Sequence, residues 1–321
     1  MNPIDDIAGF IRKNQRFALA SHLHPDGDSI GCLLAMTLGL QALGKEADAL
    51  GVDPVPFAYR GLPGVPLIHP PGKSSRPYDA LILLECSRPE RAGLEGLSPC
   101  PHIVIDHHLS CRPEGRINWI EPSFGATGQM VLRLLEALEV PICADIATNL
   151  YAALLTDTGS FQFNNTNARE LHDAARLVDY GANPGEIAEM VFHANPPSKV
   201  LLMGKVLSTL QLEAQGRMAW VVMNRQAMES AGALPEDTEG IIQHLMSIHS
   251  VELAAFFKED GDPSRFRVSL RSKGLLDVSS IAQGFSGGGH RNAAGFTIHQ
   301  RLEAGIPEVL EALRRFLSGS A

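Results

Sequence analysis

A carboxylate and two imidazoles stand together in the run Val104-Ile105-Asp106-His107-His108, directly after apolar residues that are typical of a strand. Aspartate oxygen and histidine nitrogen are ligands that many divalent cations prefer. Taken alone the tripeptide is weak evidence, because a capping aspartate followed by two loop histidines is common. It predicts a metal site only if other segments supply more ligands.

Three further segments deliver such ligands at the ends of apolar runs. The side chains that they supply are His22, Asp26, Asp28, Glu85 and Asp157. On an extended segment Asp26 and Asp28 point the same way, and Gly27 leaves the loop free to fold back toward His22. Because the carboxyl ends of parallel strands meet in one crevice, where ligands bind, the four segments together predict a two-metal site.

The elements that must position these residues alternate between strand and helix. Strand patterns at residues 17–20, 80–84 and 102–105 are interleaved with helical stripes, one of which covers residues 30–38 with Asp28 as its expected N-cap. This alternation predicts an α/β fold whose first domain is a doubly wound, mostly parallel sheet.

The composition of the chain changes at the Pro196-Pro197 pair, where two prolines end one helix. We therefore expect a first domain over residues 1–192, a linker at 193–208 and a smaller α/β domain over 209–321. An active-site cleft is expected between the two domains.

The second domain carries its own signal in a basic segment followed by a glycine-rich one. The candidate substrate-binding residues are Arg271, Ser272, Lys273, Gly288, Gly289 and His290. Glycines let a ligand approach bare backbone N–H groups, and the nearby cations would complete an anion pocket. Consecutive glycines are equally typical of a flexible loop, so both interpretations stay open here.

Composition limits the class of partner. With 321 residues and 45% hydrophobic content, the chain can bury a large core. Its 27 Lys and Arg residues against 36 Asp and Glu residues give a net charge of -9, so no broad basic surface favours long duplex nucleic acid. A short anionic substrate bound by a few local cations remains allowed.

The cysteines, the N-terminal residues and the apolar runs indicate the cellular compartment in which the protein is expected. The five cysteines are odd in number and contain no CxxC pair, which argues against a disulfide framework and a zinc knuckle. The N-terminal residues lack a positive leader, and no apolar run approaches the roughly 20 residues that span a bilayer. We expect a cytoplasmic protein without a membrane segment.

Taken in order, five segments resemble the motifs of the DHH phosphoesterase superfamily, in the branch that contains bifunctional oligoribonucleases and pAp phosphatases. Four first-domain motifs lie at residues 22–29, 85–87, 106–108 and 156–159. The fifth, at residues 287–290, resembles the glycine-rich motif of the DHH-associated C-terminal domain. The resemblance covers nearly the whole chain.

The resemblance implies a metal-dependent hydrolase that converts short oligoribonucleotides to mononucleotides and 3'-phosphoadenosine 5'-phosphate to AMP. It implies two divalent cations, Mn²⁺ first, with Mg²⁺ or Co²⁺ as alternatives. One cation would take His22, Asp26 and Glu85, and the other Asp28, Glu85, His107 and Asp157. His108 would face the phosphate and Asp106 would orient it. Partners would be short single-stranded RNA or a small nucleotide, and the resemblance suggests a homodimer.

One position departs from the family pattern. The second motif normally supplies aspartate, whereas this chain has Glu85, whose extra methylene moves the carboxylate by roughly 1.5 Å. Two-metal sites hold their ions about 3.5 to 4 Å apart, so we expect either a shifted strand end or one weakly held cation.

Other functions fit part of the pattern. The glycine-rich segment argues against a manganese pyrophosphatase, which shares only the first four motifs. A phosphodiesterase of cyclic or linear dinucleotides such as pApA and pGpG stays open. So does a nucleotide-binding module whose turnover is reduced by Glu85.

Overall fold

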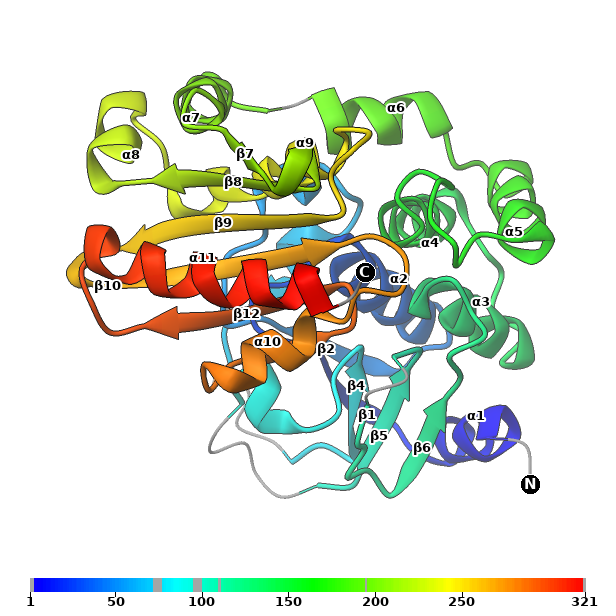
Figure 1. The fold of residues 1–321 in the computed structure, drawn as a ribbon. Helices are drawn as coiled ribbons and strands as arrows, with labels where there is room; N and C mark the ends of the chain where they lie inside the picture. Colours follow the sequence, from blue (N-terminus) through cyan, green and yellow to red (C-terminus); the bar gives the residue numbers. More distant parts are fainter. Residues whose placement is uncertain (1–2, 72–76, 95–99, 109–110, 194, 320–321) are drawn as a thin grey trace. The chain divides into compact units, whose positions relative to one another are not determined.

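The computed structural model describes residues 3–71, 77–94, 100–108, 111–193 and 195–319. The chain divides into two compact units, Met1–Ala194 and Asn195–Ala321 (Figure 1). Among the described residues, no helix combines the length and the apolar character that crossing a membrane requires.

The first unit is built on a six-stranded parallel sheet with the strand order β3-β2-β1-β4-β5-β6. Its strands are β1 (Arg16–Ala20), β2 (Glu46–Leu50), β3 (Ile68–His69), β4 (Ala80–Leu84), β5 (His102–Asp106) and β6 (Ile117–Ile120). The predicted α/β fold with a mostly parallel first sheet is confirmed.

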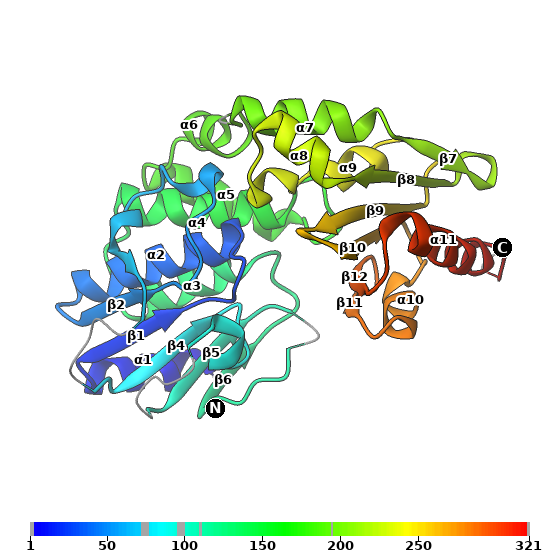
Figure 2. The same ribbon diagram turned by 90° about the vertical axis from the view of Figure 1, so that its left-hand side faces the viewer.

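Helices connect these strands and cover the sheet. The helices are α1 (Pro3–Lys13), α2 (Gly27–Ala42), α3 (Thr127–Ala137), α4 (Ala144–Asp157), α5 (Ala168–Asp179) and α6 (Pro184–Ala188), with short helical turns η1 (Phe57–Tyr59), η2 (Val65–Leu67), η3 (Pro89–Ala92) and η4 (Glu189–His193). Figures 1 and 2 show α2, α3 and α4 gathered on one side of the sheet. The sheet therefore has one face covered mainly by helices.

Side-chain alternation along the strands divides the buried residues between the two faces. Phe17 and Leu19 of β1 belong to the large core that contains α2, α3 and α4. Ala18 and Ala20 belong to a smaller core on the opposite face, together with loop residues such as Leu94. Both faces of β1 are thus buried, which holds the loop that follows it on a rigid base.

The second unit is built on a mixed sheet with the order β11-β12-β10-β9-β8-β7, in which only β8 and β9 pair in parallel. Its strands are β7 (Gln211–Glu213), β8 (Met218–Met223), β9 (Leu253–Asp260), β10 (Asp262–Ser272), β11 (Gly288–His290) and β12 (Ala293–Ile298). Its helices are α7 (Pro197–Leu207), α8 (Arg225–Ala231), α9 (Ile241–Met246), α10 (Val278–Gly284) and α11 (Leu302–Gly319), with short turns η5 (Ala214–Gly216) and η6 (Pro235–Thr238).

Two cores cover the faces of the second sheet. Figure 2 shows α7, α8 and α9 on one side and α10 and α11 on the other. Alternate residues of β9 follow this division, since Phe257 packs with α10 and α11 whereas Phe256 packs with α7, α8 and α9. The segment expected as a linker, 193–208, contains α7, whose Leu202 and Val206 are buried in this unit.

Candidate metal centre

Three of the predicted ligands lie where strands of the first sheet end. His22 is the second residue after β1, Glu85 directly follows β4 and His107 directly follows β5. Because these strands are parallel neighbours, their carboxyl ends meet at one edge of the sheet. The strand order changes direction between β1 and β4, which is where such sheets bind ligands.

The six predicted ligands and the predicted catalytic residue His108 form three overlapping groups. The groups are His22 with Asp26 and Glu85, Asp28 with His107 and Asp157, and Glu85 with His107 and His108. Within each group, one ligand atom from every residue lies within 4.8 Å of the others. Glu85 and His107 each belong to two groups, so the three groups make one continuous cluster that can hold metal ions.

Glu85 connects the groups, and its side chain is fully buried. Its φ of 55° lies in the left-handed region that residues other than glycine rarely adopt. Its Oε2 accepts a hydrogen bond from the Ser29 hydroxyl at 2.9 Å, whereas Oε1 has no hydrogen-bond partner among the described residues and lies 3.6 Å from His107 Nε2. The backbone therefore changes direction at the residue that departs from the family pattern.

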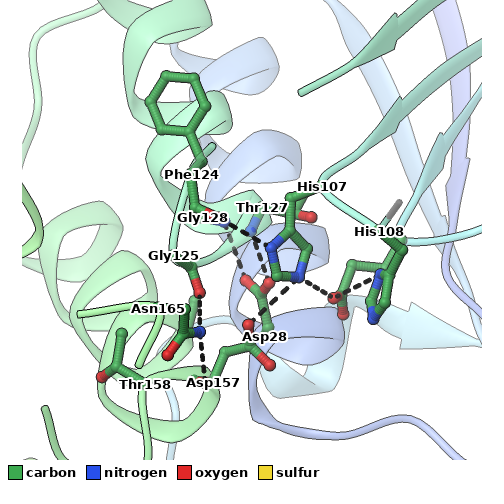
Figure 3. Close-up of polar contacts among 12 residues, drawn as sticks. Asp28, His107, His108, Phe124, Gly125, Thr127, Gly128, Asp157, Thr158 and Asn165 are labelled. Atoms are coloured by element: carbon green, nitrogen blue, oxygen red, sulfur yellow. Dashed lines mark hydrogen bonds and ion pairs between the residues drawn. The ribbon is translucent and has the colours of Figure 1, made fainter. Parts of the chain in front are cut away.

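The ring of His107 is oriented by the loop that precedes α3. Its Nδ1 lies 3.1 Å from the carbonyl oxygen of Phe124, so Nδ1 carries the hydrogen and donates to it. The lone pair of Nε2 then faces the acids, 3.2 Å from Asp157 Oδ2 (Figure 3). A carbonyl that fixes the tautomer in this way is the usual support of a metal-binding histidine.

Asp28 is held by the N-terminus of α3. Its Oδ2 accepts a hydrogen bond from Thr127 N at 2.6 Å and its Oδ1 accepts one from Gly128 N at 2.9 Å, as Figure 3 shows. The expectation that Asp28 caps its own helix is wrong. Asp26 is the N-cap of α2 and accepts from the backbone N–H of Ser29, because both acids suit that position and the chain enters the helix at Gly27.

Asp157 is the last residue of α4, and its backbone carbonyl accepts a hydrogen bond from Asn165 Nδ2 at 3.1 Å. Burial, followed by the charges of Asp28 and Asp26, raises the pKa of Asp157 to about 8. Burial and the same two carboxylates raise the pKa of Glu85 well above its ordinary value. The cluster therefore holds more negative charge than its protein surroundings balance.

This imbalance, together with the donor atoms, fits a metal ion. In the part of the chain that the structure describes, neither Glu85 nor Asp157 forms an ion pair with a lysine or arginine. Oε1 of Glu85 and Nε2 of His107 are both buried, and neither has a hydrogen-bond partner within the described ranges. Because buried polar atoms are rarely left in this state, the two atoms mark the place where a cation fits.

Asp106 and His108 form a pair beside the cluster. Asp106 is buried and accepts hydrogen bonds from both the backbone N and the Nδ1 of His108, each at 2.8 Å. Burial opposes ionisation of Asp106, but the hydrogen bonds from His108 outweigh it and lower the pKa of the carboxyl. The same hydrogen bond raises the pKa of His108, so the imidazole is favoured in its protonated form.

In the second unit, the strands place two predicted substrate residues on one row of the sheet. Arg271 in β10 and His290 in β11 both align with Ala293 of β12. The side chain of His290 lies outside what the structure describes. The glycine run forms edge strand β11 rather than a flexible loop, and a Cβ at Gly289, whose φ is 143°, would meet Ala293 O at 2.4 Å.

Arg271 and the two residues that follow it differ in how many of their hydrogen-bonding groups are available to a ligand. Arg271 is half-buried, and burial lowers the pKa of its guanidinium, which donates to the carbonyl of Leu270. Ser272 is buried, and its hydroxyl donates to Leu276 O and accepts from Asn292. Lys273 is exposed and donates to one backbone carbonyl. Ser272 thus serves the turn, while the two basic residues retain further donors.

Sequence reasoning missed the supports of the cluster. Phe124, Thr127 and Gly128 hold His107 and Asp28, and Asn165 joins the carbonyls of Gly125 and Asp157. The only sequence feature that could have indicated these supporting residues is the run of small residues before α3, and such runs are common in ordinary turns.

Comparison with known proteins identifies the family. A model of the DHH family N-terminal domain matches residues 16–154, and a model of the DHHA1 domain matches residues 218–319. The bifunctional oligoribonuclease and PAP phosphatase NrnA of Thermus thermophilus is 35% identical over 94% of this chain and 90% of its own. The chain belongs to the DHH family of phosphoesterases.

Two solved structures share this DHH fold. An exopolyphosphatase-related protein from Bacteroides fragilis has a TM-score of 0.89 and 25% identity, covering 99% of this chain and 96% of that one. RecJ of Thermus thermophilus, solved in complex with Mn²⁺, has a TM-score of 0.55 and 14% identity, covering 99% of this chain and 55% of its own. The resemblance to the DHH family is therefore confirmed in both sequence and fold.

Proposed function

We propose that this DHH phosphoesterase hydrolyses short oligoribonucleotides to mononucleotides and 3'-phosphoadenosine 5'-phosphate to AMP, with two divalent cations at the cluster. The observation that carries the proposal is the buried, unpartnered Oε1 of Glu85 facing His107 Nε2. The substrate class is taken from the name of the 35% identical relative, which spans nearly the same length.

The donor atoms favour Mn²⁺, with Mg²⁺ or Co²⁺ as alternatives, because they are carboxylate oxygens and imidazole nitrogens without a thiolate. Burial raises the pKa of Cys32, whose thiol donates to Asp28, so this sulfur stays protonated. We assign one cation to His22, Asp26 and Glu85, and the other to Asp28, Glu85, His107 and Asp157.

The residues around the cations have separate tasks. When bound, two divalent cations supply positive charge for the phosphoryl oxygens and raise the reactivity of water at neutral pH. Asp106 fixes the ring of His108 and, by raising its pKa, favours the protonated imidazole. His108, 36% exposed, then donates a hydrogen bond to an oxygen of the scissile phosphate, where negative charge grows during attack.

In the second domain, we assign binding of a substrate phosphate to Arg271, Lys273, His290 and the backbone of Gly288 and Gly289. The two basic side chains suit a dianionic phosphate, and edge strand β11 adds the backbone N–H groups that point away from β12. The net charge of -9 agrees with a short substrate, because tracking a long nucleic acid requires an extended positive groove.

Product analysis tests this proposal. The full chain is incubated with pAp, a short RNA, pApA, pGpG or a cyclic dinucleotide, with Mn²⁺ or with a chelator. We expect AMP and mononucleotides only when the cation is present. Substrate binding without cation-dependent turnover would contradict the proposal, as would turnover confined to the cyclic dinucleotide.

A matched pair of variants ties the activity to the cluster. Asp157→Ala removes a ligand at the end of α4, and Asp179→Ala removes an exposed acid at the end of α5. Asp157→Ala is expected to lower kcat/KM at least about 100-fold, since even the supports of ligands are worth 10- to 100-fold. Asp179→Ala is expected to retain the activity of the unchanged chain.

A further inference from the structure

The hydroxyl of Ser29 contacts two members of the cluster, although Ser29 belongs to none of the three groups. It lies in the first turn of α2 and is fully buried. Its Oγ lies 2.8 Å from His22 Nε2 and 2.9 Å from Glu85 Oε2. A single hydroxyl thus joins a histidine and a carboxylate of the cluster.

The place of this hydroxyl is fixed by the backbone. The N–H of Ser29 donates to Asp26 Oδ1 at 2.9 Å, the bond that caps α2. Asp26 is itself one of the predicted ligands, so the cap and the cluster share a residue. The cap therefore fixes the backbone of Ser29 relative to the cluster, so the hydroxyl can move only by turning about the Cα–Cβ bond.

The hydroxyl has one hydrogen for two acceptors. His22 Nδ1 lies 2.8 Å from its neighbour's carbonyl, Leu23 O, so Nδ1 carries the ring hydrogen and Nε2 offers a lone pair. Without a cation, that lone pair and the Glu85 carboxylate compete for the hydrogen of Ser29. If a cation were coordinated by the lone pair of His22, the hydroxyl hydrogen of Ser29 would be donated to Glu85 alone.

The two oxygens of Glu85 then have different partners. Oε2 is bound by Ser29, and Oε1 faces His107 Nε2 at 3.6 Å and His108 Nδ1 at 3.9 Å. The terminal torsion of a glutamate is broad, so nothing in the side chain itself fixes which way the carboxylate plane turns. The Ser29 hydrogen bond supplies that orientation.

We infer that Ser29 is a positioning residue, whose hydroxyl turns the Glu85 carboxylate so that one glutamate can serve both cations in place of the shorter aspartate. This inference rests on the proposed two-cation site. The extra methylene of glutamate moves the carboxylate by roughly 1.5 Å and adds a torsion, and the hydrogen bond from α2 restrains both. An aspartate at the same position would stand too far back to use the same hydroxyl.

Calorimetric titration of the chelator-treated full chain with Mn²⁺ tests the inference. The set is the unchanged chain, Ser29→Ala, Glu85→Asp and the double variant, so that the coupling between the two side chains is measured directly. Ser29→Ala is expected to weaken binding of the second Mn²⁺ by about tenfold or more, the worth of a hydrogen bond to a charged group. In the Glu85→Asp background the same change is expected to alter binding by less than about twofold.

The matched control removes another buried hydroxyl from the same helix. Thr37 is fully buried and donates to the backbone carbonyl of Leu33, so Thr37→Val should leave both Mn²⁺ affinities unchanged. Electron paramagnetic resonance adds a second measurement, because two Mn²⁺ ions sharing a carboxylate give a coupled spectrum that Ser29→Ala should weaken. If Ser29→Ala does not fold, Ser29→Cys keeps a similar volume and replaces the hydroxyl with a much weaker donor.

Two outcomes would overturn the inference while leaving the proposed function intact. One is unchanged Mn²⁺ binding in Ser29→Ala, and the other is an equal loss in both backgrounds, which would mean that the hydroxyl acts through His22. An unchanged chain that binds no Mn²⁺ would instead overturn the proposed function itself.

Discussion

Two carboxylates that are buried to the same degree in the first unit have opposite surroundings. The side chains of Asp173 and Glu85 are both 0% exposed. Asp173 accepts hydrogen bonds from Arg133 and Gln129, each at 2.6 Å, and pairs with Arg176 at 3.4 Å. Among described residues, the carboxylate of Glu85 accepts a hydrogen bond only from Ser29.

The difference distinguishes two uses of a buried charge. A carboxylate in the protein interior is costly unless it is paired and hydrogen-bonded. At Asp173 the chain itself supplies two guanidiniums, so the charge joins α3 to α5. At Glu85 the described part of the chain supplies no such cation, so burial raises the pKa of the carboxyl and leaves a charge that a bound cation would neutralise. The first carboxylate joins two helices, and the second is the one that we propose for cation binding.

Replacing Glu85 gives the largest expected effect. Glu85→Gln keeps the shape of the side chain and removes its charge, so we expect loss of one cation and a fall in kcat/KM of at least about 100-fold. The melting temperature of the metal-free protein should stay the same or rise, because the buried charge is gone. Activity assays and calorimetry with and without Mn²⁺ check both parts. A metal-free variant that melts much earlier would show that Glu85 is structural.

The matching change at Asp173 should act in the opposite way. Asp173→Asn removes one of the two anions that Arg133 and Arg176 share and leaves them Glu136, so we expect a loss of about 2 kcal/mol in the free energy of unfolding. For a unit of this size that corresponds to a melting temperature roughly 5 °C lower. Mn²⁺ affinity should change less than about threefold, which titration of the variant measures. A large loss of Mn²⁺ affinity with unchanged stability would remove the contrast between the two carboxylates.

The pH dependence of the metal-free protein follows from the raised pKa values in the cluster. Because the pKa of Asp157 is raised to about 8, the folded state binds its proton more tightly than the unfolded state does. The stability that this carboxyl contributes should therefore be complete below about pH 4 and should fall as pH rises toward 8, by up to about 1.4 kcal/mol per pH unit. Melting curves in chelator over this range measure the slope.

Two comparisons sharpen this pH prediction. Asp157→Asn should flatten the slope, since the titrating group is removed. Saturating Mn²⁺ should reverse it, because the cation and the protons compete for the same oxygens. Stability that rises with pH in chelator would contradict the assignment of a raised pKa to the cluster.

A third buried carboxylate, Glu170, gives the smallest expected effect. Its two oxygens accept from the backbone N–H groups of Gly125 and Asn167, and Arg169 lies beside it. Glu170→Gln leaves one acceptor fewer, so we expect a loss of about 1 kcal/mol in stability. Mn²⁺ affinity should fall by less than about tenfold, because Gly125 adjoins the carbonyl that orients His107. Titration and melting of one sample give both numbers.

The fold and the candidate ligands could be predicted because both depend on patterns among residues that are close together in the sequence. Apolar runs ending in acids or histidines predict strands whose carboxyl ends meet, and the parallel sheet brings those ends together. The start of α5 follows from equally local chemistry, since Asn167 and Glu170 stand three residues apart, which is the spacing of a capping box, and they form one. Such features depend on neighbours only three or four residues away.

The N-cap of α2 shows where local reading fails. Asp26 and Asp28 have the same capping chemistry and stand two residues apart, so their pattern cannot assign the cap. The structure gives the cap to Asp26 and turns Asp28 to Thr127 and Gly128, about a hundred residues further along the chain. Packing of α2 beside α3 makes that choice.

The sequence by itself therefore determined which side chains are available to bind a cation and which edge of the sheet carries them, because strand and helix periodicity are encoded in adjacent residues. Only the tertiary structure decided how each is held: the left-handed backbone of Glu85, the Ser29 hydroxyl against its Oε2, and the two arginines that neutralise Asp173 but not Glu85. Those contacts join segments far apart in the chain, and their geometry depends on how helices and strands pack rather than on any spacing.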